Sequence, residues 1–101
     1  MNSFMKAENK LEGATNYRAW KAMIDLPLAR HKVLGIVIGI VIEPVDQAGK
    51  EKFKEDYILA RSIIIESVRD HLISYIADQQ TSKGMYDAII GLYTINNVNQ
   101  S

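Results

Sequence analysis

Residues 11–20 read Leu-Glu-Gly-Ala-Thr-Asn-Tyr-Arg-Ala-Trp, and this stretch predicts a turn that runs into the start of a helix. Gly13 permits a tight turn of the backbone. Thr15 or Asn16 can cap the helix, because the side-chain oxygen of either residue accepts a hydrogen bond from an otherwise unpaired backbone N–H. The first helix is therefore expected to begin directly after this turn.

The first helix is predicted over 17–32 from the spacing of its apolar residues. Tyr17 and Trp20 lie three positions apart and share one helical face. Trp20 is the only tryptophan of the chain and the expected centre of its core. Pro27 lies inside this span, where a proline removes a backbone hydrogen bond and crowds the preceding turn, at a cost of about 3 kcal/mol. We expect a kink near 25–26, or two helices that meet there.

The apolar run at 33–42 is ambiguous in secondary structure. Its β-branched residues favour a strand, but the chain has no second strand of similar quality to pair with it, and a lone strand is unstable. A short helical turn over 33–38, followed by an extended segment as far as Pro44, satisfies both observations. Residues 46–50 are predicted to form a loop.

The clearest helical pattern covers residues 50–69, where apolar side chains recur at intervals of three and four. The inward positions are Phe53, Tyr57, Ala60, Ile64 and Val68. The pattern continues through 70–76, directly or after a break. A polar connector then supplies Thr81 or Ser82 as the cap of a last helix, predicted over 83–94.

These elements predict one all-α domain over 11–95, a small bundle of about four to five helices. Residues 1–10 are expected to be a flexible lead-in, from which Phe4 and Met5 can pack back onto the domain. Residues 96–101 are expected to be a polar tail.

The composition is that of a globular protein, with 48% hydrophobic residues, 24% charged residues and a formal net charge of zero. A neutral chain lacks the charge excess expected of a partner of duplex DNA or anionic membranes. The absence of cysteine excludes disulfides, thiolate catalysis and Cys-containing zinc sites. The chain starts without the apolar region of a signal peptide, and its longest apolar run is half of the roughly 20 residues that span a bilayer. We expect a cytoplasmic protein without a membrane partner.

No residues of the sequence have the spacing typical of a catalytic or metal site. His31 and His71 are the only histidines, and neither lies in a metal-ligand pattern. Glu55 and Asp56 are adjacent, so on a helix their side chains diverge by roughly 100°. No Gly-rich phosphate loop or nucleophile elbow occurs. The sequence therefore predicts no enzyme, no cofactor, no metal ion and no small-molecule substrate.

A nucleic-acid-binding surface on the first helix is an alternative. Tyr17 and Trp20 would lie near its basic residues, which are Arg18, Lys21, Arg30 and Lys32. The near-neutral net charge offers little free energy from counterion release, however, and Trp20 fits a core position.

Three blocks of the chain together resemble the Gag polypeptide of Ty1/copia-type LTR retrotransposons. The first block lies at 11–20, the second at 28–44 and the third at 64–93. The residues that carry the resemblance are Leu11, Gly13, Asn16, Tyr17, Trp20, Leu28, Asp70, Leu72, Tyr86, Leu92 and Tyr93. Tyr86 stands where the family prefers tryptophan, which implies a diverged copy.

The resemblance implies the N-terminal, capsid-like part of a Gag, with the fold of a capsid N-terminal domain. Its function would be structural: it would pack against other copies of itself in a virus-like particle around element RNA. A second helical part, an RNA-binding zinc knuckle and the enzymes of the polyprotein would lie outside this chain. A Gag fragment adopted by its host as a protein-interaction domain is a further alternative.

A partial Gag domain is expected to expose apolar surface, and such surface promotes association. The expected contributors are Val37, Ile38, Ile40 and Ile42, together with the edge formed by Tyr86 and Tyr93.

Overall fold

The computed structural model describes residues 6–100, and it confirms the all-α fold class that the sequence predicts. The helices are α1 Tyr17–Arg30, α2 Leu34–Ile38, α3 Gln47–Glu66, α4 Asp70–Ile76 and α5 Ser82–Gln100, with short 3-10 turns at Ala7–Asn9 and Ala14–Asn16. No strand is present in 6–100. Phe4 and Met5, expected to pack onto the domain, lie outside the described residues.

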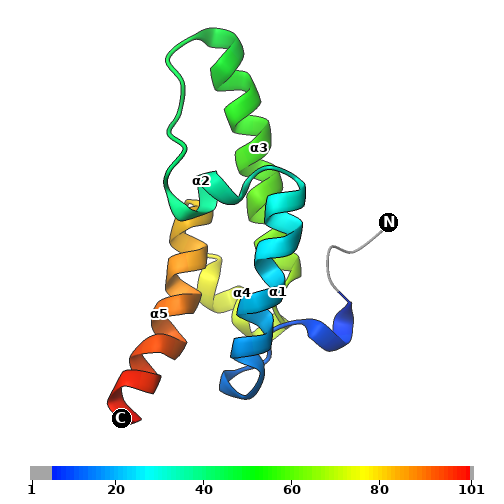
Figure 1. Ribbon diagram of the computed structural model, residues 1–101, viewed down its shortest axis with the longest axis vertical. Helices are drawn as coiled ribbons and strands as arrows, with labels where there is room; N and C mark the ends of the chain where they lie inside the picture. Colours follow the sequence, from blue (N-terminus) through cyan, green and yellow to red (C-terminus); the bar gives the residue numbers. More distant parts are fainter. Residues whose placement is uncertain (1–5, 101) are drawn as a thin grey trace.

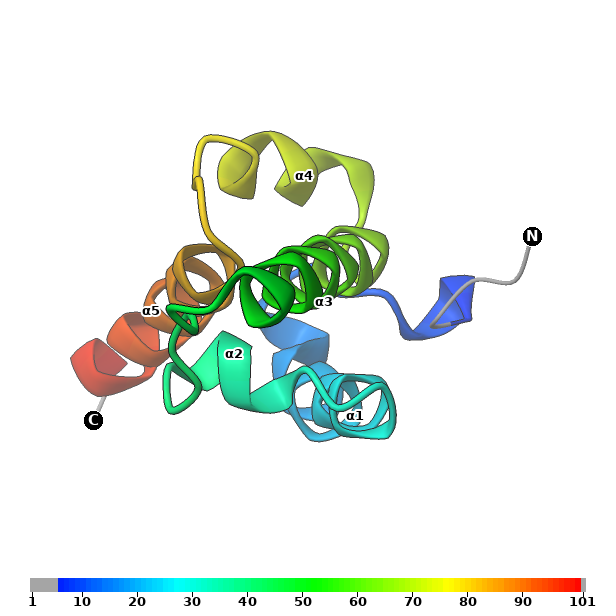
Figure 2. The same cartoon turned by 90° about the horizontal axis from the view of Figure 1, so that it is seen from above.

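Helix α3 is the longest helix and the axis around which the others gather (Figures 1 and 2). Seen from above, α4 lies on one side of α3, and α1 and α2 lie on the other, with α5 beside α2 (Figure 2). Helix α3 contacts α1, α2 and α5. The first half of α3 projects beyond the other helices, accompanied by the segment 39–46 that connects it to α2 (Figure 1).

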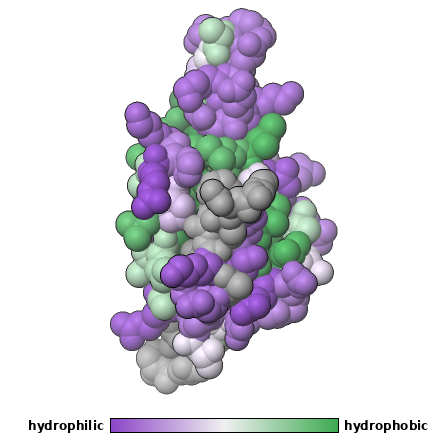
Figure 3. Space-filling model, turned by 90° about the vertical axis from the view of Figure 1, so that its right-hand side faces the viewer, coloured by the Kyte–Doolittle hydropathy of each residue, from purple (hydrophilic) through white to green (hydrophobic). Residues whose placement is uncertain are grey.

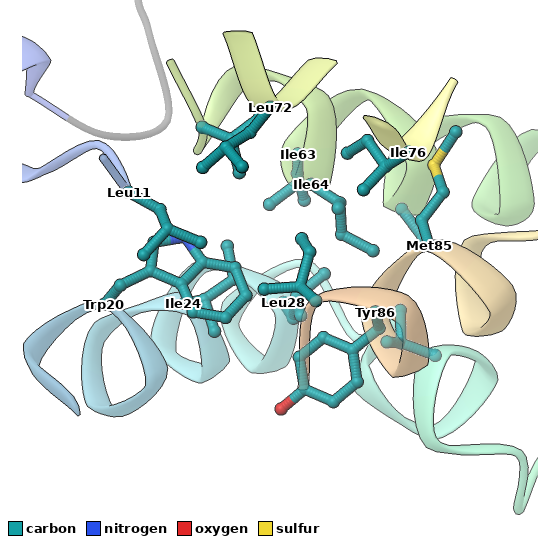
Figure 4. Close-up of a cluster of buried hydrophobic side chains, with 14 of the residues drawn as sticks. Leu11, Trp20, Ile24, Leu28, Ile63, Ile64, Leu72, Ile76, Met85 and Tyr86 are labelled. Carbon is teal, nitrogen blue, oxygen red and sulfur yellow. The ribbon is translucent and has the colours of Figure 1, made fainter. Parts of the chain in front are cut away.

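One hydrophobic core joins all five helices, and each large aliphatic side chain buried there contributes about 1.5–3 kcal/mol. Trp20 and Leu11 lie at one end of this core and Met85 lies at the other (Figure 4). The core residues are Leu11, Tyr17, Trp20, Ile24, Leu28, Val33, Val37, Ala60, Ile63, Ile64, Val68, Leu72, Ile76, Met85, Tyr86, Ile89 and Tyr93.

Helix α3 begins earlier than the sequence predicts, so the predicted loop at 46–50 is wrong. The Asp46 carboxylate accepts a hydrogen bond from the backbone N–H of Gly49 (2.7 Å) and caps the helix, which starts at Gln47. The helix ends at Glu66, and α4 follows after a short break, which was one of the two alternatives for this region.

Helix α1 continues through Pro27, so the alternative of two helices meeting there is wrong. The short helical turn predicted at 33–38 is confirmed as α2, and Gly39 ends it in the left-handed conformation (φ 88°) that glycine adopts without a steric penalty. Helix α5 runs to Gln100, well past the predicted end, so residues 96–100 are helical and do not form a separate tail.

Candidate functional site

The segment around Leu11 is anchored to the junction between α3 and α4. The backbone N–H of Leu11 donates to the carbonyl of Ser67 (2.9 Å), and the Leu11 carbonyl accepts from the N–H of Arg69 (3.0 Å). The side chain of Leu11 is fully buried beside Trp20 (Figure 4). Two backbone hydrogen bonds and one buried leucine therefore fix the start of the domain to a segment that is distant in sequence.

Asn16 closes the turn before α1 and does not cap the helix, so the predicted cap is wrong. Its amide oxygen accepts hydrogen bonds from the backbone N–H groups of Glu12 (3.0 Å) and Gly13 (3.3 Å). Its amide nitrogen donates to the carbonyl of Lys10 (2.9 Å). The helix begins without a side-chain cap, because the asparagine points back and satisfies the turn.

Trp20 and Ser67 form the only buried side-chain pair with a hydrogen bond in the part of the chain that the structure describes. The indole N–H of Trp20 donates to the Ser67 hydroxyl (3.1 Å), which donates to the carbonyl of Ile64 (2.7 Å). The indole is therefore buried without an unpaired donor. Sequence reasoning missed Ser67, since no local signal separates it from the other serines of the chain.

Four aromatic rings from the two ends of the domain pack together. Tyr17 lies 5.0 Å from Tyr93 and 6.0 Å from Trp20 between ring centroids, and Trp20 lies 6.4 Å from Tyr86. Tyr86 and Tyr93 are buried, so the expectation that they form an exposed edge is wrong. Stacked and tilted aromatic pairs add about 0.5–1.5 kcal/mol each beyond area burial.

The hydroxyl of Tyr86 reaches a small polar cluster on α1. It donates a hydrogen bond to the Asp25 carboxylate (2.7 Å), and the ammonium of Lys21 lies 3.4 Å from the same carboxylate and 5.5 Å from the Tyr86 ring centroid. Burial raises the pKa of Tyr86 and also that of Tyr93. The hydrogen bond with Tyr86 raises the pKa of Lys21. This cluster holds α5 against α1.

Most of the predicted signature residues meet in the core, and Asp70 lines a surface hollow of about 630 Å³ beside Glu12 and His71. Leu28 and Leu72 are buried, and Leu92 packs against the core while half-buried. Asp70 is exposed at the first residue of α4, and Gly13 lies in the turn before α1. Most of these residues therefore take part in the packing of the bundle.

His71 is hydrogen-bonded to the turn that precedes α1. Its Nε2 donates a hydrogen bond to the carbonyl of Glu12 (2.7 Å), and the guanidinium of Arg69 pairs with the Glu12 carboxylate (3.2 Å).

Within residues 6–100, no three His, Cys, Asp or Glu side chains gather as metal ligands. No helix among these residues has the length and hydropathy required to cross a bilayer.

The first helix does not present aromatic and basic side chains on one surface. Tyr17 and Trp20 are buried, and Lys21 pairs with Asp25. Bases therefore have no exposed ring to stack on there, which is how such modules hold single strands.

Five exposed apolar side chains lie close together in sequence in the segment 38–46, which runs from the last residue of α2 to the residue before α3. Val45 is 93% exposed, Ile42 80% and Ile40 75%, and Ile38 and Val41 are also exposed. The expected exposure of Ile38, Ile40 and Ile42 is therefore correct, whereas Val37, expected to be exposed, is fully buried. Figure 3 shows the molecule from the right-hand side of Figure 1, and on that side the projecting end of α3 is mostly hydrophilic.

A groove of about 590 Å³ adjoins this segment. The aromatic rings of Phe53 and Tyr57 line it, and the Tyr57 hydroxyl donates a hydrogen bond to the carbonyl of Gln80. Its charged lining residues are Glu43, Lys50, Glu51 and Lys54. This groove and the exposed segment make up the candidate interaction site.

Comparison with known proteins gives no relative: no protein-family model, no curated protein and no solved structure matches the chain.

Proposed function

We propose that this chain is the capsid-like N-terminal part of a Gag polypeptide of the Ty1/copia type, and that it works by packing against copies of itself. The resemblance supports the proposal through residues scattered from Leu11 to Tyr93, most of which share one core.

The observation that carries the proposal is the exposed apolar segment. Large aliphatic side chains that cluster on a surface mark sites of association. Residues 38–46 present five of them, whereas the core is closed around Trp20 without them. Self-assembly would bury these side chains at the contact between copies of the chain.

In this proposal the protein is cytoplasmic, is not an enzyme and binds no cofactor. Element RNA would be held by parts of the polyprotein outside this chain. A host-adopted fragment would use the same exposed segment with a different protein partner. A small nucleic-acid-binding module is the less favoured alternative, because Tyr17 and Trp20 are buried.

Negative-stain electron microscopy of the purified chain, prepared with and without single-stranded RNA, tests the proposal. Self-assembly predicts discrete, uniform assemblies at high protein concentration in the absence of RNA. The affinity of the same protein for single-stranded RNA is measured by filter binding at two salt concentrations. Submicromolar, strongly salt-dependent binding without assemblies would contradict the proposal and favour the nucleic-acid module.

A further inference from the structure

The segment that joins α2 to α3 has the backbone conformation that an endoprotease requires of its substrate. Residues 42–44 belong to no helix or turn, and the segment runs as an extended connection beside the projecting end of α3 (Figure 1). Within residues 6–100, the backbone N–H groups of Ile42, Glu43 and Val45 donate to no backbone acceptor. Endoproteases bind a peptide as an added strand, through hydrogen bonds to its main chain. The backbone groups that such an enzyme needs are therefore available here.

One peptide bond of the segment combines a free N–H with an aliphatic residue on each side. The N–H groups of Gly39, Ile40 and Val41 all donate to the carbonyl of Gly35 (3.0–3.1 Å), which restrains the bonds before Val41. The next bond joins Val41 to Ile42, whose N–H is unpaired and whose side chain is 80% exposed. The bonds that follow involve a glutamate, a proline or an aspartate.

We propose that the Val41–Ile42 peptide bond is a site of limited proteolysis, cut by an endoprotease whose subsites accept aliphatic side chains. Hydrolysis consumes one water molecule. The water oxygen becomes part of the new carboxylate of Val41, and both water protons end on the new ammonium group of Ile42. This inference goes beyond the proposed function, because it concerns a site for a different protein and does not require self-assembly.

Exposure of an aliphatic side chain does not by itself make such a site. Leu26 is 62% exposed on α1, and Ile58 is 52% exposed on α3. Both residues lie inside helices, so cleavage beside them requires the helix to open locally. Exposed irregular segments are the preferred sites of nicking in folded proteins. Leu26 and Ile58 are therefore internal controls for any enzyme that recognises aliphatic residues.

A cut at this bond leaves two pieces that share one core. Residues 38–46 contribute no side chain to that core. Helices α1 and α2 lie before the cut, and both contact α3, which lies after it. Two side-chain hydrogen bonds cross the cut, from Trp20 to Ser67 (3.1 Å) and from Tyr86 to Asp25 (2.7 Å). The nicked domain is therefore expected to stay folded, with lower stability because its two pieces are no longer one chain.

Limited proteolysis of the dilute full chain tests the site. Thermolysin cuts before large aliphatic residues and elastase cuts after small ones, so both enzymes can cut the Val41–Ile42 bond. Intact-mass spectrometry locates the first cut within residues 11–93. We expect the pieces 1–41 and 42–101 to accumulate together while the bonds beside Leu26 and Ile58 stay intact. Ile42→Asn should slow the thermolysin cut at this bond at least about tenfold, since it removes the aliphatic side chain that the enzyme recognises. Leu26→Asn is the control and should leave the rate unchanged.

The outcomes separate the site from the stability of the nicked domain. A first internal cut at Leu26 or Ile58, cuts scattered over the chain, or an unchanged rate for Ile42→Asn would overturn the site. No internal cut at enzyme concentrations that digest the urea-unfolded chain would overturn it as well. Size-exclusion chromatography of the nicked protein should give one species that contains both pieces. Separation of the pieces after a cut at Val41–Ile42 would establish the site and overturn the retained fold.

Discussion

Trp20 and Ser67 lie 47 residues apart in the sequence, and the indole N–H of Trp20 donates a hydrogen bond to the hydroxyl of Ser67 (3.1 Å). The serine follows the last residue of α3, its carbonyl accepts a hydrogen bond from the backbone N–H of Leu11, and the N–H of Arg69 donates to the Leu11 carbonyl. The start of the domain, the first helix and the end of the third helix are therefore joined at one buried point.

Removal of the indole tests this junction. Trp20→Ala is expected to lower the free energy of unfolding by about 3–5 kcal/mol, since it leaves a cavity in a fully buried site. Domains of this size have a total stability of about 5–15 kcal/mol. Denaturant titration measures the change, with Leu26→Ala as the control because Leu26 is 62% exposed on the same helix. Equal, small changes for both variants would mean that Trp20 is not a core residue.

The hydrogen bond itself is tested at Ser67. Ser67→Ala leaves the buried indole N–H without a partner, and we expect a loss of about 1–3 kcal/mol. Ser62→Ala is the matched control, because the Ser62 hydroxyl donates only to the carbonyl of Ile58 within α3. Denaturation midpoints of the two variants are compared, and an effect at Ser62 as large as that at Ser67 would contradict the role of the buried pair.

Alkaline pH should destabilise the fold through Tyr86. Burial raises the pKa of Tyr86 above its ordinary value of about 10, so on raising the pH the unfolded chain loses this proton first. The stabilisation is complete below the ordinary pKa and is lost as the pH rises through the folded pKa. The raised pKa values of Tyr93 and Lys21 act in the same direction.

The variant Tyr86→Phe removes this contribution, together with the hydrogen bond that raises the pKa of Lys21. Melting temperatures measured from pH 8 to 11 should fall less steeply for the variant than for the wild type, with a residual slope from Tyr93. Parallel curves for the two proteins would show that Tyr86 titrates alike in the folded and unfolded chains.

Replacement of glycine by alanine is expected to have opposite effects on stability at Gly39 and at Gly91. Gly39 has a positive φ, and a Cβ added there would lie 2.7 Å from the Lys83 side chain, so Gly39→Ala should destabilise the domain by about 1 kcal/mol or more. Gly91 lies within α5 and has open space around it, so Gly91→Ala should stabilise by about 0.5–1 kcal/mol. Thermal denaturation of both variants measures the difference, and the same sign for both would contradict the assigned conformations.

The sequence was sufficient to predict the helices whose apolar spacing is regular. Trp20 was correctly placed in the core, and the short helical turn before Gly39 was identified because a lone strand has no partner. The predicted loop at 46–50 is wrong because the N–H of Gly49 donates to the Asp46 carboxylate, and this cap starts α3 at Gln47.

Contacts between distant segments could not be derived from spacing. Nothing local indicates that Leu11 pairs with Val68, or that the hydroxyl of Tyr86 reaches Asp25. The same reason explains why Tyr86 and Tyr93 were expected to be exposed: their burial depends on Tyr17 and Trp20, which come from the other end of the domain.

Sedimentation velocity over a concentration series tests self-assembly most directly. Wild-type protein is compared with Ile40→Lys, which places a charge in the exposed segment, and with Leu26→Lys, which places the same charge on an exposed apolar position of α1. Self-assembly predicts discrete, concentration-dependent species for the wild type and for Leu26→Lys, and their loss in Ile40→Lys. A wild-type protein that stays monomeric at the highest concentration, or species that persist unchanged in Ile40→Lys, would contradict assembly through this segment.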